Sequence, residues 1–112
     1  MDGSSSRDYT FIEDIVEGIM AAVRHEFEYD IFNLGNSSPV ALLTLIRTIA
    51  EYLGMKAVIQ WLPEQPGDVP ITFADVSKAN CLLGYFPNTP FAEGMRKFID
   101  WYQTCRPLPY PV

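Results

Sequence analysis

Apolar residues recur at three- and four-residue steps in three stretches of the chain, which is the spacing of an amphipathic helix. The first stretch begins at Ile12, and acidic residues fill its first turns, where the helix dipole stabilises anions. The second is expected to begin at Ser38-Pro39, an N-cap residue followed by proline, and to end at Gly54. The third is expected to begin at Thr89-Pro90. The apolar positions of these helices are Ile12, Ile15, Val16, Ile19, Met20 and Val23; Leu42, Leu43, Leu45, Ile46, Ile49 and Leu53; and Phe91, Met95, Phe98 and Tyr102.

Shorter apolar or alternating runs between the helices predict extended segments or strands at residues 7–11, 29–34, 58–62 and 71–74. Asp75 is expected to cap a short helix that runs to Leu83 and ends at Gly84. The pattern predicts a mixed α/β domain of about four helices and four short strands in residues 1–105. Residues 106–112 contain three prolines and are expected to form an extended tail.

Composition narrows the class of protein. The 112 residues are 48% hydrophobic, which suits one folded domain, and the net charge is −6 with the few basic residues scattered. Nucleic acid is therefore not an expected partner. No apolar run approaches the ~20 residues that span a bilayer, and no signal peptide is visible, so we expect a soluble, cytoplasmic chain. The two cysteines, Cys81 and Cys105, are expected to be reduced thiols.

Motifs for catalysis are not visible. His25 is expected to lie solvated at the polar end of the first helix, and the scattered glycines form neither a dinucleotide fingerprint nor a P-loop. Tyr52 and Lys56 match the Tyr-x-x-x-Lys spacing of short-chain dehydrogenases, but Gly54 ends the helix between them. This match is interpreted as chance, and no catalytic, cofactor-binding or metal-binding residue is predicted.

Two polar segments have the character of a binding site. Arg7 offers a fork of donors suited to phosphate, and Tyr9 offers a flat ring with a hydroxyl. The loop from Gln65 to Asp68 presents a carboxylate that could accept hydrogen bonds from a ribose. Together they suggest a phosphorylated, hydroxyl-rich ligand. The alternative is a surface ion pair and an ordinary Pro-Gly turn.

Four ordered motifs resemble a known family. They are RDYTFIEDI (residues 7–15), IFNLG (31–35), QPGDV (65–69) and ADVSKA (74–79), and the similarity continues through Leu83-Gly84-Tyr85 and the last helix. The chain resembles the C-terminal, substrate-binding part of extended short-chain dehydrogenase/reductases that act on nucleotide sugars, and most of all the UDP-glucuronate 4-epimerases. Such enzymes are NAD-dependent isomerases.

The resemblance implies roles for particular residues. Arg7 is expected to reach the diphosphate of a UDP-sugar, Tyr9 to line the same pocket, and Asp68 to contact the uridine ribose. Gln65 stands where related UDP-galactose epimerases have an arginine, so its contact with phosphate would be a neutral hydrogen bond. Asp75 and Lys78 are expected to cap and solvate the short helix rather than to touch ligand.

The family's Rossmann lobe, with its glycine-rich NAD turn and catalytic Tyr-x-x-x-Lys, has no counterpart in these residues. Met1 directly precedes residues that resemble the interior of the family's sequence, so we expect a cut domain or a truncated gene. The chain is therefore expected to bind no NAD and to hold part of a UDP-sugar without turning it over. The alternative is a non-catalytic remnant that associates with itself or with a partner chain through apolar surface. Some oligomer is expected in either case.

Overall fold

The computed structural model describes residues 3–105, so the predicted tail, residues 106–112, lies outside the described part. Four helices account for most of the regular secondary structure: α1 (Ile12–Arg24), α2 (Leu42–Leu53), α3 (Ser77–Leu83) and α4 (Phe91–Cys105). Two short strands, β1 (Ser6–Arg7) and β2 (Val40–Ala41), pair antiparallel, with Ser6 opposite Ala41 and Arg7 opposite Val40. The prediction of four helices is confirmed, and the sheet is smaller than expected.

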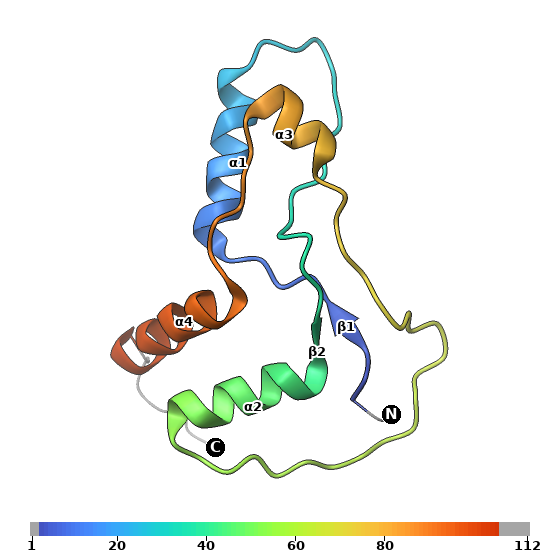
Figure 1. The fold of residues 1–112 in the computed structure, drawn as a ribbon, viewed down its shortest axis with the longest axis vertical. Helices are drawn as coiled ribbons and strands as arrows, with labels where there is room; N and C mark the ends of the chain where they lie inside the picture. The colour runs from blue at the N-terminus through green and yellow to red at the C-terminus, as the bar shows by residue number, and fades with distance from the viewer. Residues whose placement is uncertain (1–2, 106–112) are drawn as a thin grey trace.

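The helices form two pairs at opposite ends of the molecule. Helix α1 packs against α3 at one end, α2 packs against α4 at the other, and the β1–β2 ladder lies between the pairs (Figure 1). After α2 the chain runs as a long open segment around the outside before it returns to α3 (Figure 1). Within residues 3–105 the two helix pairs therefore do not share one core at the centre of the molecule.

The buried core lies between α1, α3 and the segments that flank them. Gly18 of α1 allows this packing, because a Cβ there would lie 2.8 Å from Leu34 and 3.0 Å from Tyr85. The core consists of Val76, Ala79, Leu83 and Tyr85, with Ala21, Ala22, Phe32, Leu34 and Ala74 packed against it.

The molecule is more open than a compact protein of its size. Its radius of gyration is 17.0 Å, whereas a compact chain of this length has about 13 Å. Its accessible surface is 8590 Å², whereas a folded monomer of this mass exposes about 6,200 Å². Large apolar side chains are exposed on α1 and α4 and along residues 55–73, so the apolar faces found in the sequence are only partly covered.

Two of the predicted strands are wrong. Residues 29–34 and 58–62 are irregular, and in residues 71–74 only Ile71 makes a bridge, parallel to Ser6. An alternating sequence becomes a strand only beside another strand that offers free backbone groups. Within residues 3–105 the sheet has the two strands β1 and β2, so these segments have little edge to pair with.

The starts of three helices also differ from the prediction. Helix α2 begins at Leu42 rather than Ser38-Pro39, because Val40 and Ala41 pair with β1 first. In α4 the Pro90 carbonyl accepts the first helical bond, from Gly94 N–H at 3.0 Å, so Pro90 is the N-cap. The N-cap of α3 is Val76 rather than the predicted Asp75. The Asp75 carboxylate, one position before the cap, accepts the N–H of Ser77 at 3.0 Å, and hydrogen bonds from Ser77 lower the pKa of Asp75.

Candidate functional site

The structure brings together two of the predicted binding residues, Arg7 and Asp68. The guanidinium Nη2 of Arg7 on β1 lies 3.8 Å from the Asp68 carboxylate, and both side chains are partly exposed. Backbone hydrogen bonds hold the two segments in place: Ser6 N–H donates to the Pro70 carbonyl at 2.8 Å, and Thr72 N–H donates to the Ser6 carbonyl at 3.1 Å. A cation suited to phosphate and an acceptor suited to ribose hydroxyls therefore share one surface.

The loop that carries Asp68 is the tight turn that the sequence predicted. Asp68 N–H donates to the Gln65 carbonyl at 3.2 Å, and Gly67 has φ +90°, a value that favours glycine. Pro66 fixes the preceding φ. Gln65 is exposed at the start of this turn, on the same loop as Asp68. The turn thus presents Asp68 from a stiff backbone.

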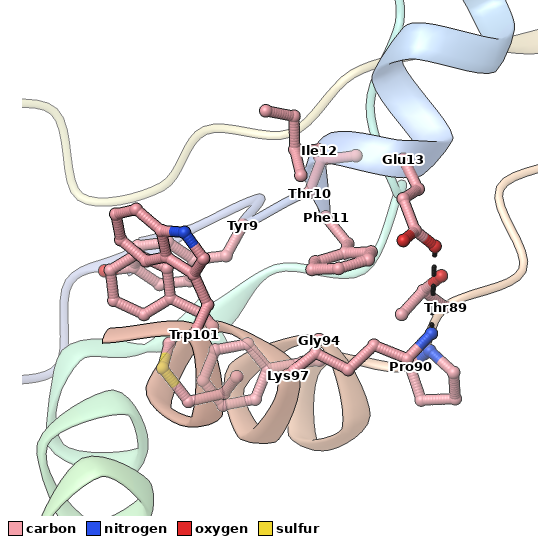
Figure 2. A pocket seen from close by; sticks show the side chains of 13 residues that line it. Tyr9, Thr10, Phe11, Ile12, Glu13, Thr89, Pro90, Gly94, Lys97 and Trp101 are labelled. Carbon is pink, nitrogen blue, oxygen red and sulfur yellow. Dashed lines mark ion pairs between the residues drawn. The ribbon is translucent and has the colours of Figure 1, made fainter. Parts of the chain in front are cut away.

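Tyr9 contributes to a different surface. Its ring packs against Phe91 with centroids 5.8 Å apart, and it lines an apolar groove of about 910 Å³ between residues 9–13 and the first turns of α4. Figure 2 shows Tyr9, Phe11 and Trp101 around this groove, with Lys97 near its edge. Lys97 pairs with Glu13 at 3.8 Å and lies 5.2 Å from the Phe11 ring centre. The predicted placement of Tyr9 beside the phosphate contact stays a prediction.

Asp8 is a structural residue that the sequence interpretation missed. Its carboxylate accepts backbone N–H groups from Asn36 at 3.1 and 3.2 Å, from Ser37 at 2.9 Å, from Ser38 at 3.3 Å and from Ala74 at 3.1 Å. It therefore joins three segments directly beside Arg7. Ser37 has φ 52°, and the turn around it exposes N–H groups that need an acceptor. The turn-rich run from Gly35 to Ser38 was the available signal in the sequence.

Asp14 has a structural role that the sequence interpretation missed. It lies in the first turn of α1, as the acidic pattern predicts, and it is also only 2% exposed. Its carboxylate accepts the N–H of Thr89 at 3.1 Å and that of Asn88 at 3.4 Å. It thus fixes the start of α4 against α1.

Lys78 does more than solvate its helix, contrary to the sequence interpretation. Its ammonium pairs with Asp30 and donates to the Ile31 carbonyl at 3.0 Å, and the hydrogen bond from Lys78 lowers the pKa of Asp30. It also lies 4.9 Å from the ring centre of Phe32. Lys78 therefore anchors the irregular 29–34 segment to α3.

His25, Tyr52 and the two cysteines lie at helix ends or on the surface of the described structure. His25 caps the C-terminal end of α1, exposed, and stacks on Phe27 with centroids 5.5 Å apart. Gly54 ends α2 in the left-handed conformation at φ 63°, and the Tyr52 hydroxyl donates to the Ala92 carbonyl at 3.1 Å. Cys81 and Cys105 are free and exposed. Across residues 3–105 no cluster of His, Cys, Asp and Glu could hold a metal ion, and none of the helices there has the length and apolarity to cross a membrane.

Comparisons with known proteins extend this picture. No protein-family model matches the chain. An uncharacterized protein of Methanocaldococcus jannaschii is 48% identical over 100 residues, which cover 89% of this chain and 31% of that protein. UDP-glucuronate 4-epimerase 4 of Arabidopsis thaliana is 38% identical over 114 residues, covering 89% of this chain and 26% of the enzyme. The chain is homologous to a segment of UDP-glucuronate 4-epimerases.

The fold of the chain is shared with such enzymes as well. The structure of the Bacillus cereus UDP-glucuronic acid 4-epimerase, in complex with UDP-glucuronic acid and NAD, matches with a TM-score of 0.83 and 29% identity. The match covers 93% of this chain and 34% of that enzyme. The four helices and two-stranded sheet therefore correspond to part of a short-chain dehydrogenase epimerase. The chain spans about a quarter to a third of the length of these proteins.

Proposed function

We propose that this epimerase segment holds the diphosphate and ribose of a UDP-sugar, UDP-glucuronate above all, and does not itself carry out epimerisation. The observation that carries the proposal is the 3.8 Å approach of Arg7 to Asp68, whose segments are joined by the backbone bridge between Ser6 and Ile71. Arg7 supplies charge-assisted donors for phosphate oxygens, and Asp68 supplies two acceptor oxygens for ribose hydroxyls. Gln65, on the same turn, adds neutral donors, while Tyr9 lines the separate groove beside Phe91.

The Arg7–Asp68 ion pair does not oppose this role. Both side chains are exposed by about a third or more, at 32% and 52%. An exposed pair of this kind contributes about 0–1 kcal/mol. A diphosphate can therefore take over the Arg7 guanidinium at little cost, because it carries more charge than one carboxylate. NAD and the hydride and proton transfers belong, in this proposal, to the other two thirds of the homologous enzymes.

Ligand titration of the 112-residue chain tests the proposal. UDP, UDP-glucuronate and inorganic pyrophosphate are added up to millimolar concentration while backbone amide shifts are followed by NMR. We expect shifts centred on Arg7 and on residues 65–69, and about ten-fold weaker binding in Arg7→Ala, which loses a charged hydrogen bond. Arg96→Ala, which removes an exposed arginine from α4, is the matched control and should bind as wild type does.

The variant Asp68→Asn distinguishes the proposed phosphate contact of Arg7 from the proposed ribose contact of Asp68. Because Asp68 competes with phosphate for Arg7, its neutralisation should strengthen pyrophosphate binding while it weakens UDP binding through the lost ribose acceptor. A wild-type chain that responds to none of these ligands at millimolar concentration would overturn the proposal. So would an equal loss of affinity in Arg7→Ala and Arg96→Ala.

A second candidate is a non-catalytic interaction segment. The observation in its favour is the open shape, with a radius of gyration of 17.0 Å and apolar side chains exposed along α1 and α4. Such surface in a chain of this size is typical of one that packs against another protein surface.

A further inference from the structure

Strand β1 has a neighbouring segment on each side, and both pairings end near its last residue, Arg7. On one side β1 pairs antiparallel with β2, and Arg7 lies opposite Val40. On the other side Ser6 bridges Ile71 in parallel. The Arg7 guanidinium donates from Nη1 to the Ser6 carbonyl at 2.9 Å, so it is held against this end of the strand. A group that fixes both neighbouring segments here would also fix the surroundings of Arg7.

The Asp8 carboxylate continues the parallel pairing beyond the end of β1. Thr72 N–H donates to the Ser6 carbonyl, and in a parallel pair the next bond of this kind would join Ala74 N–H to the carbonyl of residue 8. Ala74 N–H donates instead to the Asp8 carboxylate at 3.1 Å, while the Asp8 carbonyl accepts the Thr10 hydroxyl at 3.3 Å. A side chain thus takes the place of the backbone and keeps the register of residues 70–74 against β1.

The same carboxylate holds the segment on the other side of β1. It accepts the N–H groups of residues 36–38, which directly precede β2. The Ser37 hydroxyl donates to the Ala74 carbonyl at 2.5 Å, so the two neighbouring segments are also joined to each other beyond the end of β1. Asp8 therefore fixes both edges of the strand at the position that follows Arg7.

Gly35 allows these segments to meet. A Cβ at Gly35 would lie 2.6 Å from the Ala74 Cβ and 2.7 Å from Oδ2 of Asp8. The Gly35 carbonyl accepts the hydroxyl of buried Tyr85 at 2.9 Å, which joins this cluster to the core. The Asp8 carboxylate is thus packed closely and attached to the core, and it is a fixed point for the segments on both sides of it.

We propose that Asp8 is a positioning residue that sets the spacing of Arg7 and Asp68, and that it thereby makes the site prefer a nucleoside diphosphate to free pyrophosphate. This inference rests on the proposed function of Arg7 and Asp68. A nucleoside diphosphate would contact both side chains, so its affinity depends on their being held at the right spacing. Pyrophosphate needs Arg7 alone. Loss of the Asp8 contacts should therefore affect the two ligands differently, whereas a general loss of stability would affect them equally.

Titration of the 112-residue chain with UDP and with inorganic pyrophosphate tests the inference. We expect Asp8→Asn to weaken UDP binding by about ten-fold and to leave pyrophosphate binding within about two-fold of wild type. Ser37→Ala removes only the hydroxyl bond to Ala74, so it is the milder variant if Asp8→Asn fails to fold, and it should lower the ratio of UDP to pyrophosphate affinity by a smaller factor. Thr48→Ala removes a comparable hydroxyl bond within α2 and should leave both affinities unchanged.

Amide hydrogen exchange tests the positioning without any ligand. In Asp8→Asn the exchange of Thr72 N–H should rise about ten-fold relative to that of Gly94 N–H in α4, because Thr72 is bonded beside the lost contact and Gly94 is not. Equal acceleration at both positions would overturn the inference. So would an unchanged ratio of UDP to pyrophosphate affinity in Asp8→Asn, and that result would leave the proposed function standing. A wild-type chain that binds neither ligand would overturn the proposed function and this inference with it.

Discussion

The carboxylate of Asp8 accepts the backbone N–H of Ala74 at 3.1 Å, across 66 positions of the sequence. The same carboxylate accepts three further N–H groups from residues 36–38. Arg7, the proposed phosphate contact, precedes Asp8 directly. The side chain that organises the site is therefore not one that would touch the ligand.

Asp8→Asn should destabilise the fold. The amide keeps one acceptor oxygen but turns an NH₂ group toward backbone N–H donors, so two or more of these donors lose their partner. We expect the free energy of unfolding to fall by about 2 kcal/mol, measured by urea denaturation followed by circular dichroism. Asp100→Asn is the matched control: Asp100 is exposed and pairs only along α4 with Arg96 at 3.6 Å, so its loss should cost under about 0.5 kcal/mol. Equal effects of the two variants would contradict the role given to Asp8.

Gly18→Ala should also destabilise the fold, although alanine favours helices. The added Cβ would lie 2.8 Å from Leu34 and 3.0 Å from Tyr85, and such overpacking costs about 1–3 kcal/mol. The gain in helix propensity returns only about 0.5–1 kcal/mol. Gly94→Ala on α4 is the control, because its Cβ would meet Phe11 at 3.2 Å, a contact that a small shift relieves. A melting temperature of Gly18→Ala at or above that of wild type would refute this account.

Stability should fall at high pH because of Tyr85. Burial first, and then the charge of Asp14, raise the pKa of the Tyr85 phenol above its ordinary value of 10.0. A raised pKa in the folded state means that the contribution of Tyr85 is complete below about pH 10 and declines as pH rises through the folded value. Denaturation at pH 8 and again above pH 10 should show the loss.

Tyr85→Phe identifies the source of that pH dependence. It removes the hydrogen bond from the Tyr85 hydroxyl to the Gly35 carbonyl at 2.9 Å, so below pH 10 it should be less stable than wild type by about 1 kcal/mol. The difference should shrink as pH rises above 10. A difference that stays constant with pH would assign the alkaline loss to other groups.

The sequence predicts the helices well because their signals are local. The apolar periodicity locates α1, α2 and α4, and Gly54 and Gly84 end α2 and α3 with φ 63° as expected. The Pro-Gly turn before Asp68 is local as well, and it is confirmed. Each of these features depends on residues within a few positions of one another.

Features that depend on distant partners could not be predicted in the same way. The run from Tyr29 to Leu34 has the composition of a strand, but no strand lies beside it in the described structure. Periodicity also finds a helix without saying which side is buried: the apolar side of α1 is exposed, and the side with Asp14 and Gly18 is packed. Glu13 and Asp14 are therefore neighbouring acidic residues in the sequence, but Glu13 is exposed in the structure and Asp14 is buried.

The structure brings together only part of the predicted site, because the position of each of its residues also depends on partners that are distant in the sequence. Arg7 and Asp68 meet because Ser6 bonds with Pro70 and Thr72, a pairing that no short motif reveals, and only the resemblance to nucleotide-sugar enzymes placed the two in one pocket. The roles of Gln65 and Tyr9 remain predictions.

The open segment that follows α2 can change in length without moving the proposed ligand contacts. Its far end is fixed to β1 at Pro70 and Thr72, so the Arg7–Asp68 geometry does not depend on the length of chain between Gly54 and Gln65. Doubling a loop of this kind costs only about 0.6 kcal/mol of closure entropy. Residues can therefore be inserted or deleted there while the two ligand contacts keep their spacing, and this stretch is the natural place to attach a fluorophore or a foreign domain.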